Sequence, residues 1–208
     1  MSFASFFSEQ AREPNGLFGR LVMSPFFDIG NASLIRLANE IISIQENDRV
    51  LEIGFGTGKL ISKMANRIER GEIDGVDLSE IMVSVAEKRN RTHIAKGKVR
   101  LLHGDFDKTL FQTGYYDKVC SVNTIYFWEN PADTAKKIAE ILKPKGKIVL
   151  GFEGGEQLIQ KKLKDDVYHI YSPKEIVSLL LSAGFSNGID IQSRQFGQTE
   201  LYCVVATK

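Results

Sequence analysis

The sequence predicts an α/β protein built on a doubly wound, mainly parallel sheet. Short apolar runs alternate with segments of helical period along most of the 208 residues, and neighbouring parallel strands need such helical crossovers between them. The glycine-rich stretch 54–58 follows one of these runs directly and precedes a helical pattern, as a strand-to-helix turn would. We therefore expect a seven-stranded sheet with helices on both faces.

The first 46 residues precede the alternating pattern. Proline and glycine interrupt residues 2–31, which predicts short helical turns and loops there. The phenylalanines of this stretch are Phe3, Phe6, Phe7, Phe18, Phe26 and Phe27. From Asn31, a predicted N-cap, an apolar helical period continues to the break at 46–48. We expect a single domain over 1–208, with 1–46 as a helical, aromatic lid region; that these phenylalanines only complete the core remains the alternative.

The remaining elements follow in order. Strands are predicted around 50–53 and at 73–77, 99–102, 118–122, 147–150, 189–193 and 200–207. Helices are predicted over about 57–70, from a Ser79 cap, from Asn130-Pro131 to the Lys143-Pro144 stop, and from the capping box at 172–175 to Gly184. Only a short turn at 197–198 joins the last two strands, so we expect them to form an antiparallel hairpin.

Composition and charge limit the classes of partner. With 43% hydrophobic and 25% charged residues the chain is long enough for one substantial core. A formal net charge of +1 gives no global attraction for nucleic acid, and the basic residues within 59–70 recur at the spacing of a solvated helix face. We therefore expect no nucleic-acid partner. The sequence does not predict an oligomeric state.

Cysteine and histidine usage bears on compartment and metals. Cys120 and Cys203 lie inside apolar runs, which indicates a reduced, cytoplasmic setting. The three histidines are scattered and there is no C-x-x-C pair, so no metal site is expected. We expect neither a signal peptide nor a membrane span, because no apolar run reaches about 18 residues. A weak association of the aromatic N-terminal stretch with a membrane surface stays open.

The stretch from Glu52 through Gly54-Phe55-Gly56-Thr57-Gly58 identifies a cofactor loop, because glycines let a ligand lie directly against the backbone. A phosphate-binding P-loop needs four residues between its glycines and Ser or Thr after the lysine, whereas three separate Gly54 from Gly58 and Leu60 follows Lys59. A dinucleotide fingerprint would need a small residue where Lys59 stands, so NAD is a minor alternative. A glycine turn without any ligand is the other alternative.

An acid followed by G-x-G-x-G closely resembles motif I of the class I S-adenosylmethionine-dependent methyltransferases. The resemblance implies a Rossmann-like fold with an antiparallel last strand, S-adenosyl-L-methionine as cofactor, and a loop that meets its methionine end. Asp77 ends the second strand, where a carboxylate can accept hydrogen bonds from ribose hydroxyls. By resemblance, Asp105 accepts from the adenine amino group and Phe106 packs on the ring. The cofactor-binding residues expected are Glu52, Gly54, Phe55, Gly56, Thr57, Gly58, Asp77, Leu78, Asp105, Phe106, Asn123 and Thr124.

The stretch 121–131 leaves the fourth strand where the family places its reactive methyl group. It lacks the Asn-Pro-Pro-Tyr type of tetrapeptide found in many nucleic-acid amino-methyltransferases, and it supplies Tyr126, Phe127 and Trp128 instead. Such rings can attract a sulfonium cation or form the wall of an apolar pocket. Methyl transfer needs mainly alignment of donor and acceptor. If a base assists, Tyr126 and His169 are the catalytic candidates, with His103 as a third.

We therefore expect an enzyme that transfers the methyl group of S-adenosylmethionine to a small, lipophilic acceptor. The glycine stretch and the aromatic N-terminal stretch together look most like the branch that contains the quinone-biosynthesis methyltransferases. Two alternatives remain. A catalytically silent protein would use the same pocket to hold the cofactor, and a protein or RNA methyltransferase would need an added basic recognition surface.

Overall fold

The computed structural model describes residues 10, 12–154 and 169–208, so the predictions for Phe3, Phe6 and Phe7 lie outside the described residues. Seven strands form one sheet in the order β3-β2-β1-β4-β5-β7-β6. Their bounds are Arg49–Ile53 (β1), Glu72–Asp77 (β2), Val99–His103 (β3), Tyr116–Val122 (β4), Leu142–Glu153 (β5), Asn187–Phe196 (β6) and Thr199–Thr207 (β7). Strand β7 is antiparallel to both β5 and β6, whereas the other neighbouring pairs are parallel. The predicted fold is confirmed.

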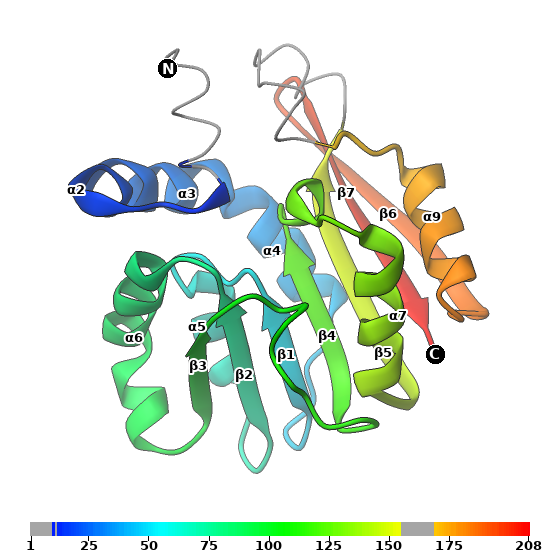
Figure 1. Ribbon diagram of the computed structural model, residues 1–208, viewed down its shortest axis with the longest axis horizontal. Coiled ribbons are helices and arrows are strands. Elements are labelled where there is room, and N and C mark those ends of the chain that lie inside the picture. Colours follow the sequence, from blue (N-terminus) through cyan, green and yellow to red (C-terminus); the bar gives the residue numbers. More distant parts are fainter. Residues whose placement is uncertain (1–9, 11, 155–168) are drawn as a thin grey trace.

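Helices cover both faces of the sheet (Figure 1). Side chains of α4 (Ala32–Ile41), α5 (Lys59–Ala65) and α6 (Glu80–Ala95) pack in one core cluster. Those of α7 (Pro131–Ile141) and α9 (Pro173–Ser182) pack in the other. Successive strand residues alternate between the two layers: Val50 belongs to the first cluster, and Leu51 to the second. This alternation fixes which side chains of a strand reach either layer.

The predicted helix starts have the expected caps. The Ser79 hydroxyl accepts from the Met82 N–H, and the Asn130 side chain accepts from the Asp133 N–H. Ser172 forms a full capping box with Glu175. These caps satisfy N–H groups that have no partner inside the helix. The cap residues therefore fix where α6, α7 and α9 begin.

Helix α5 is shorter than the predicted 57–70. It begins at Lys59 because Gly58 adopts a left-handed conformation, with φ +71°. It ends at Ala65, and shortly afterwards the backbone N–H groups of Glu69, Arg70 and Gly71 converge on the Glu46 carbonyl. This tertiary turn replaces the last helical turns that the sequence pattern suggested.

The segment before α4 is more helical than expected. Helix α2 (Gly16–Phe18), the π-helical turn η1 (Gly19–Met23) and α3 (Ser24–Gly30) follow one another without a break. We call residues 12–30 the arm. In Figure 1 α2 and α3 lie above α6 and the carboxyl ends of β2 and β3. None of the helices in the described part of the chain is long and apolar enough to cross a membrane.

Asn31 lies at the predicted N-cap position of α4, but its side chain makes no capping hydrogen bond. Its backbone is helical, its N–H donates to the Phe27 carbonyl at 3.0 Å, and its carbonyl accepts from the Ile35 N–H at 2.8 Å. Because α3 runs almost directly into α4, backbone groups take the place of the side-chain cap. The Asn31 amide is thereby available for a contact elsewhere.

Candidate active site

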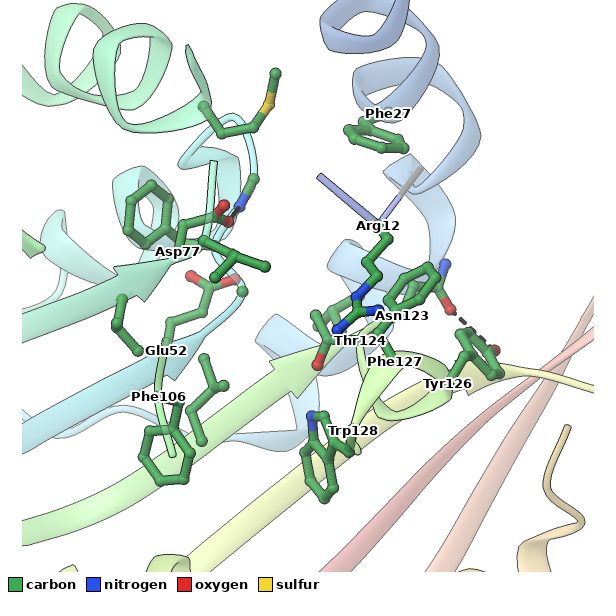
Figure 2. A pocket seen from close by; sticks show the side chains of 18 of the residues that line it. Arg12, Phe27, Glu52, Asp77, Phe106, Asn123, Thr124, Tyr126, Phe127 and Trp128 are labelled. Atoms are coloured by element: carbon green, nitrogen blue, oxygen red, sulfur yellow. Dashed lines mark hydrogen bonds between the residues drawn. The ribbon is translucent and has the colours of Figure 1, made fainter. Parts of the chain in front are cut away.

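A cavity of about 320 Å³ lies at the carboxyl ends of the parallel strands, where a doubly wound sheet binds its ligands. Its walls come from the glycine turn, the ends of β2 to β5 and the arm. Figure 2 shows Glu52 and Asp77 on one side of this space and Asn123, Tyr126 and Phe127 on the other. The two sides differ in chemistry, and we describe them in turn.

The three glycines of the turn all have positive φ, at +69°, +52° and +71°. Two of them are also required by packing. A Cβ on Gly54 would overlap the Thr124 side chain, and one on Gly58 would lie 2.7 Å from Ala86 Cβ. A Cβ on Gly56 would have no atom within 4 Å. Gly56 therefore faces open space in the cavity, where a ligand can approach the backbone closely.

Asp77 anchors the turn from the neighbouring strand. Its Oδ2 accepts from the Gly56 N–H at 2.7 Å, and its Oδ1 accepts from the Ser79 N–H at 2.9 Å. Burial raises the pKa of this carboxyl to about 6, although the same two N–H groups act to lower it. Sequence reasoning predicts Asp77 as a ligand contact but did not predict that this carboxylate holds the glycine turn in shape.

Glu52 lies in the cavity wall and is only 3% exposed. Its Oε2 atom has no hydrogen-bond partner among the described residues. Burial raises the pKa of Glu52 well above its ordinary value, and the charge of Asp77 raises it further. An unsatisfied buried acceptor typically costs about 1–3 kcal/mol. A cationic ligand in this cavity would remove that cost.

Asp105 and Phe106 follow β3 and also line the cavity. Asp105 is more open than a ligand carboxylate in a closed pocket: its side chain is 32% exposed and its Oδ2 lies 2.9 Å from Lys108 Nζ. That contact is the main cause of the lowered pKa of Asp105. Phe106 is buried, with the Lys137 ammonium 4.9 Å from its ring centroid. The predicted adenine-side pair is therefore present, although its carboxylate already has a cation beside it.

The other side of the cavity begins at the end of β4. Asn123 has φ +57°, and Thr124 is hydrogen-bonded through its hydroxyl to Ser121. The Asn123 amide donates to Asn31 Oδ1 at 2.9 Å, which is the contact that replaces the expected cap. The Tyr126 hydroxyl accepts from the Glu153 N–H at 2.7 Å. Asn31, Tyr126 and Glu153 thus meet around Asn123 although they are distant in sequence.

Two of the three suggested bases, His103 and His169, are not among the residues that line the cavity. The His169 side chain is exposed, and its backbone N–H donates to the Tyr126 carbonyl at 3.1 Å. His103 is exposed and its ring nitrogen contacts the Leu78 carbonyl at 3.0 Å. Only Tyr126 lines the cavity. Sequence reasoning missed Glu153, although it ends β5 just as Asp77 ends β2, and the same strand-end rule would have identified it.

The arm forms part of the cavity lining, and Figure 2 shows its Arg12 and Phe27 beside that space. Asp28 accepts from Arg89 Nη2 at 2.5 Å and from the Thr57 hydroxyl at 2.6 Å. Burial acts to raise the pKa of Asp28, but these hydrogen bonds outweigh it and the pKa is lowered. The Ser79 hydroxyl donates to the Pro14 carbonyl at 2.5 Å, and Arg12 pairs with Glu129 at 2.8 Å. The arm is thereby held on both sides of the cavity.

These features suit a cofactor that carries positive charge, ribose hydroxyls and an adenine. They are the glycine turn, the buried Glu52 carboxylate with one unsatisfied oxygen, and the acids at the ends of the strands. Comparison with known proteins agrees. The chain matches the family model described as "Methyltransferase domain" over residues 50–146. It is 30% identical over 168 residues to the uncharacterized methyltransferase YdaC of Bacillus subtilis, covering 80% of this chain and 87% of YdaC. It is 25% identical over 140 residues to the ubiquinone/menaquinone biosynthesis C-methyltransferase UbiE of Azotobacter vinelandii, covering 66% of this chain and 55% of that enzyme.

Solved structures show the same fold. A methyltransferase dependent on S-adenosylmethionine from Aquifex aeolicus superposes with a TM-score of 0.68 at 18% identity, covering 88% of this chain and 95% of that one. Phosphoethanolamine N-methyltransferase 2 of Haemonchus contortus, solved with S-adenosylhomocysteine, gives 0.77 at 16% identity and covers 100% of this chain and 60% of that one. The chain belongs to the class I S-adenosylmethionine-dependent methyltransferases. Its cofactor is S-adenosylmethionine.

Proposed function

We propose that the enzyme transfers the methyl group to a small, apolar acceptor. The observation that carries this proposal is the aromatic lining of the cavity beyond the glycine turn. Phe26 and Phe27 contribute from the arm, and Phe127 and Trp128 contribute from the segment after β4. Apolar, aromatic walls with few polar groups are typical of small-molecule sites. The likeness to UbiE, whose name refers to ubiquinone and menaquinone biosynthesis, supports the same class of acceptor.

The strand order suggests how the cofactor lies. Asp105, Asp77 and Glu52 end or follow the adjacent strands β3, β2 and β1. We propose that they face the adenine, the ribose and the methionine end, in that order. The remaining cofactor contacts proposed are Gly54, Phe55, Gly56, Thr57, Gly58, Leu78, Phe106, Asn123 and Thr124. This direction leaves the reactive methyl group nearest to the ends of β4 and β5.

S-adenosylmethionine, when bound, supplies a methyl group on a sulfonium leaving group. The task of the chain is then to align the acceptor and keep water out. Phe127 and Trp128 form the wall along which the acceptor lies, and their faces favour the nearby sulfonium by up to about 2 kcal/mol. Tyr126 acts as a positioning residue, since its hydroxyl holds the Glu153 backbone. We do not assign His169 a role, because its side chain is exposed.

The arm acts as a lid in this proposal, within a single methyltransferase domain. Its contacts with Thr57, Ser79 and Glu129 close the space above the turn. Closure over a cofactor excludes water and aligns the reactants. We also propose a cytoplasmic location, because Cys120 and Cys203 are unpaired and buried in the core.

The test supplies methyl-labelled S-adenosylmethionine to the full chain with three separate pools of acceptors: small organic molecules, proteins and RNA. Label in an organic-extractable product is expected, and the Asp77→Ala variant should give much less of it. Label that appears in protein or RNA instead would overturn the proposal. Binding of the cofactor without transfer to any pool would also overturn it, in favour of a protein that only holds the cofactor.

A further inference from the structure

The two edges of the sheet differ in how they are protected. Strands β3 and β6 lie at opposite ends of the sheet order (Figure 1). Strand β3 has five residues and packs against α6. In β6, by contrast, nine of the ten residues are exposed, and among the described residues its only neighbour in the sheet is β7. The helices of both layers therefore leave most of β6 uncovered.

The sequence of β6 lacks the usual protection against pairing with another strand. Exposed edge strands are commonly kept short or are interrupted by proline, lysine or a bulge. Residues 187–196 contain neither proline nor lysine, and the irregularity in their pairing with β7 is confined to 187–190. Residues 190–196 are thus regular strand, whose outer edge presents backbone N–H and C=O groups. An extended strand is the kind of partner that this edge fits.

The charges on β6 select a second copy of the same chain. Two identical edge strands that pair antiparallel are related by a two-fold axis perpendicular to the sheet, so residues of the same face meet. With Gln192 opposite its own counterpart, Asp190 of each copy lies opposite Arg194 of the other. Registers centred on residue 190 or 194 place like charges opposite each other, which is destabilising. The pattern of charge therefore favours the register centred on Gln192.

Both charged side chains can make this contact while they keep their present ones. Arg194 Nη2 lies 2.9 Å from Glu40 Oε2, and both of these side chains are about half exposed. A guanidinium has five N–H donors, so it can bind a second carboxylate. Asp190 Oδ2 accepts from the Gln192 amide at 3.1 Å, and a carboxylate has room for about four hydrogen bonds.

The same register covers apolar side chains that β6 leaves exposed. Phe196 is 62% exposed and Ile191 is 42% exposed. Phe196 of one copy lies against Gly188 of the other, which has no side chain to obstruct the ring. The two Ile191 side chains become diagonal neighbours on the other face of the joined sheet. Pairing of the two strands therefore removes apolar surface from water on both faces.

We propose that β6 is the interface of a homodimer, in which two copies pair antiparallel through residues 188–196 and their sheets become one. This inference is independent of the proposed function, because the cavity lining includes no residue of β6 in the part of the chain that the structure describes. A single pair of strands buries less than the roughly 1,200–2,000 Å² of a typical stable interface. We therefore expect a dissociation constant in the micromolar range.

Sedimentation velocity of the full chain, from about 1 to about 200 µM, tests this proposal, because that range spans a micromolar dissociation constant. The wild type should form dimers. Asp190→Arg places arginine opposite arginine at two points, and it should weaken the dimer roughly ten-fold or more. Arg194→Asp should do the same with two acids. Glu87→Arg makes an equal change of charge at an exposed position of α6 and should behave as the wild type.

A mixture of the two variants separates strand pairing from misfolding. Asp190→Arg has two positive residues at these positions and Arg194→Asp has two negative ones, so both cross-strand contacts are attractive only in the mixed dimer. The equimolar mixture should therefore associate to within about three-fold of the wild type. Salt at about 1 M should reduce the difference between the wild type and Asp190→Arg, because it screens exposed charges.

Three results would overturn the proposal. They are a wild type that stays monomeric throughout this concentration range, an Asp190→Arg variant that associates as the wild type does, and a mixture that associates no more than either variant alone. The first result needs no variant, so a misfolded variant does not prevent the test. Circular dichroism and thermal unfolding check that each variant is folded before it is mixed.

Discussion

The cavity has two halves that solve different physical problems. The half that we propose for the cofactor, at the ends of β1 to β3, has the backbone groups of the glycine turn and carboxylates beside apolar side chains, and it contains the Glu52 oxygen that has no partner among the described residues. The acceptor half, at the ends of β4 and β5, consists of aromatic rings and of side chains that hydrogen-bond one another. Without ligand the cofactor half therefore has an electrostatic cost that the acceptor half avoids. The cofactor can offset this cost, so ligand binding and protein stability should be coupled mainly through the first half.

The largest effect is expected at Asp77. Asp77→Ala removes the proposed ribose contact and also the anchor of the Gly56 N–H. Hydrogen bonds to charged groups contribute about 1.5–3 kcal/mol, so S-adenosylmethionine should bind roughly ten- to a hundred-fold more weakly. Calorimetric titration measures the change. Asp117→Ala is the control, because Asp117 pairs with Lys143 in the part of β4 away from the cavity and should leave the affinity unchanged.

A second prediction concerns stability. Glu52→Gln removes a buried charge whose Oε2 atom has no hydrogen-bond partner among the described residues, so the cofactor-free protein should become more stable, by about 1–3 kcal/mol near neutral pH. Cofactor affinity should fall roughly ten-fold in the same variant. Asp74→Asn is the contrasting variant, because Asp74 is equally buried but accepts hydrogen bonds from Arg100 and Tyr116. The Asp74→Asn protein should therefore be less stable than the wild type. Urea denaturation measures the stability of both variants. A change of the denaturation midpoint in the same direction for both would contradict the comparison.

The pH dependence of stability follows from the same group. The folded pKa of Glu52 lies well above its ordinary value of 4.5, so the native state binds more protons than the unfolded chain between those values. The contribution of Glu52 is therefore most favourable below about 4.5 and is lost as pH rises through the folded pKa. Asp77, with a pKa of about 6, acts in the same direction. Glu52→Gln and saturating cofactor should each make the denaturation midpoint depend less on pH.

Loosening the arm tests whether methyl transfer can be impaired without an equal loss of cofactor affinity. Arg89→Ala removes the cation that holds Asp28, and with it one attachment of the arm to the turn. We expect roughly a ten-fold loss of methyl transfer to any acceptor found, with cofactor affinity reduced by only about three-fold. Hydrogen exchange of the arm amides should quicken as well. Arg91→Ala, an exposed position two residues along α6, is the control. If the arm only completes the core, Arg89→Ala would instead lower the global stability of the protein.

The same division explains what could be predicted from the sequence. Glu52, Gly56 and Asp77 lie within 26 residues of one another, so their spacing predicts the loop and the strand ends, and the resemblance to motif I of the methyltransferases implies the cofactor. Glu153 and Asn31 both contact Asn123 only because β5 lies beside β4 and the arm turns over the sheet. Nothing local signals that contact, and the local signal at Asn31 favoured a helix cap. Tertiary contacts also decided the early end of α5, since the Glu46 carbonyl comes from another segment.

The smallest effect is expected at Asp105, where the structure changes the magnitude that the sequence suggested. A buried carboxylate would discriminate strongly between adenine and hypoxanthine, but this one is partly exposed and has Lys108 beside it. Replacing the exocyclic amine of S-adenosylhomocysteine by a carbonyl should therefore weaken binding only about three-fold, since water and Lys108 offset part of the lost hydrogen bond. Asp105→Asn should remove that preference. Competition calorimetry with the two nucleosides measures it, and a preference that survives in Asp105→Asn would place the adenine contact on other groups, such as the backbone next to Phe106.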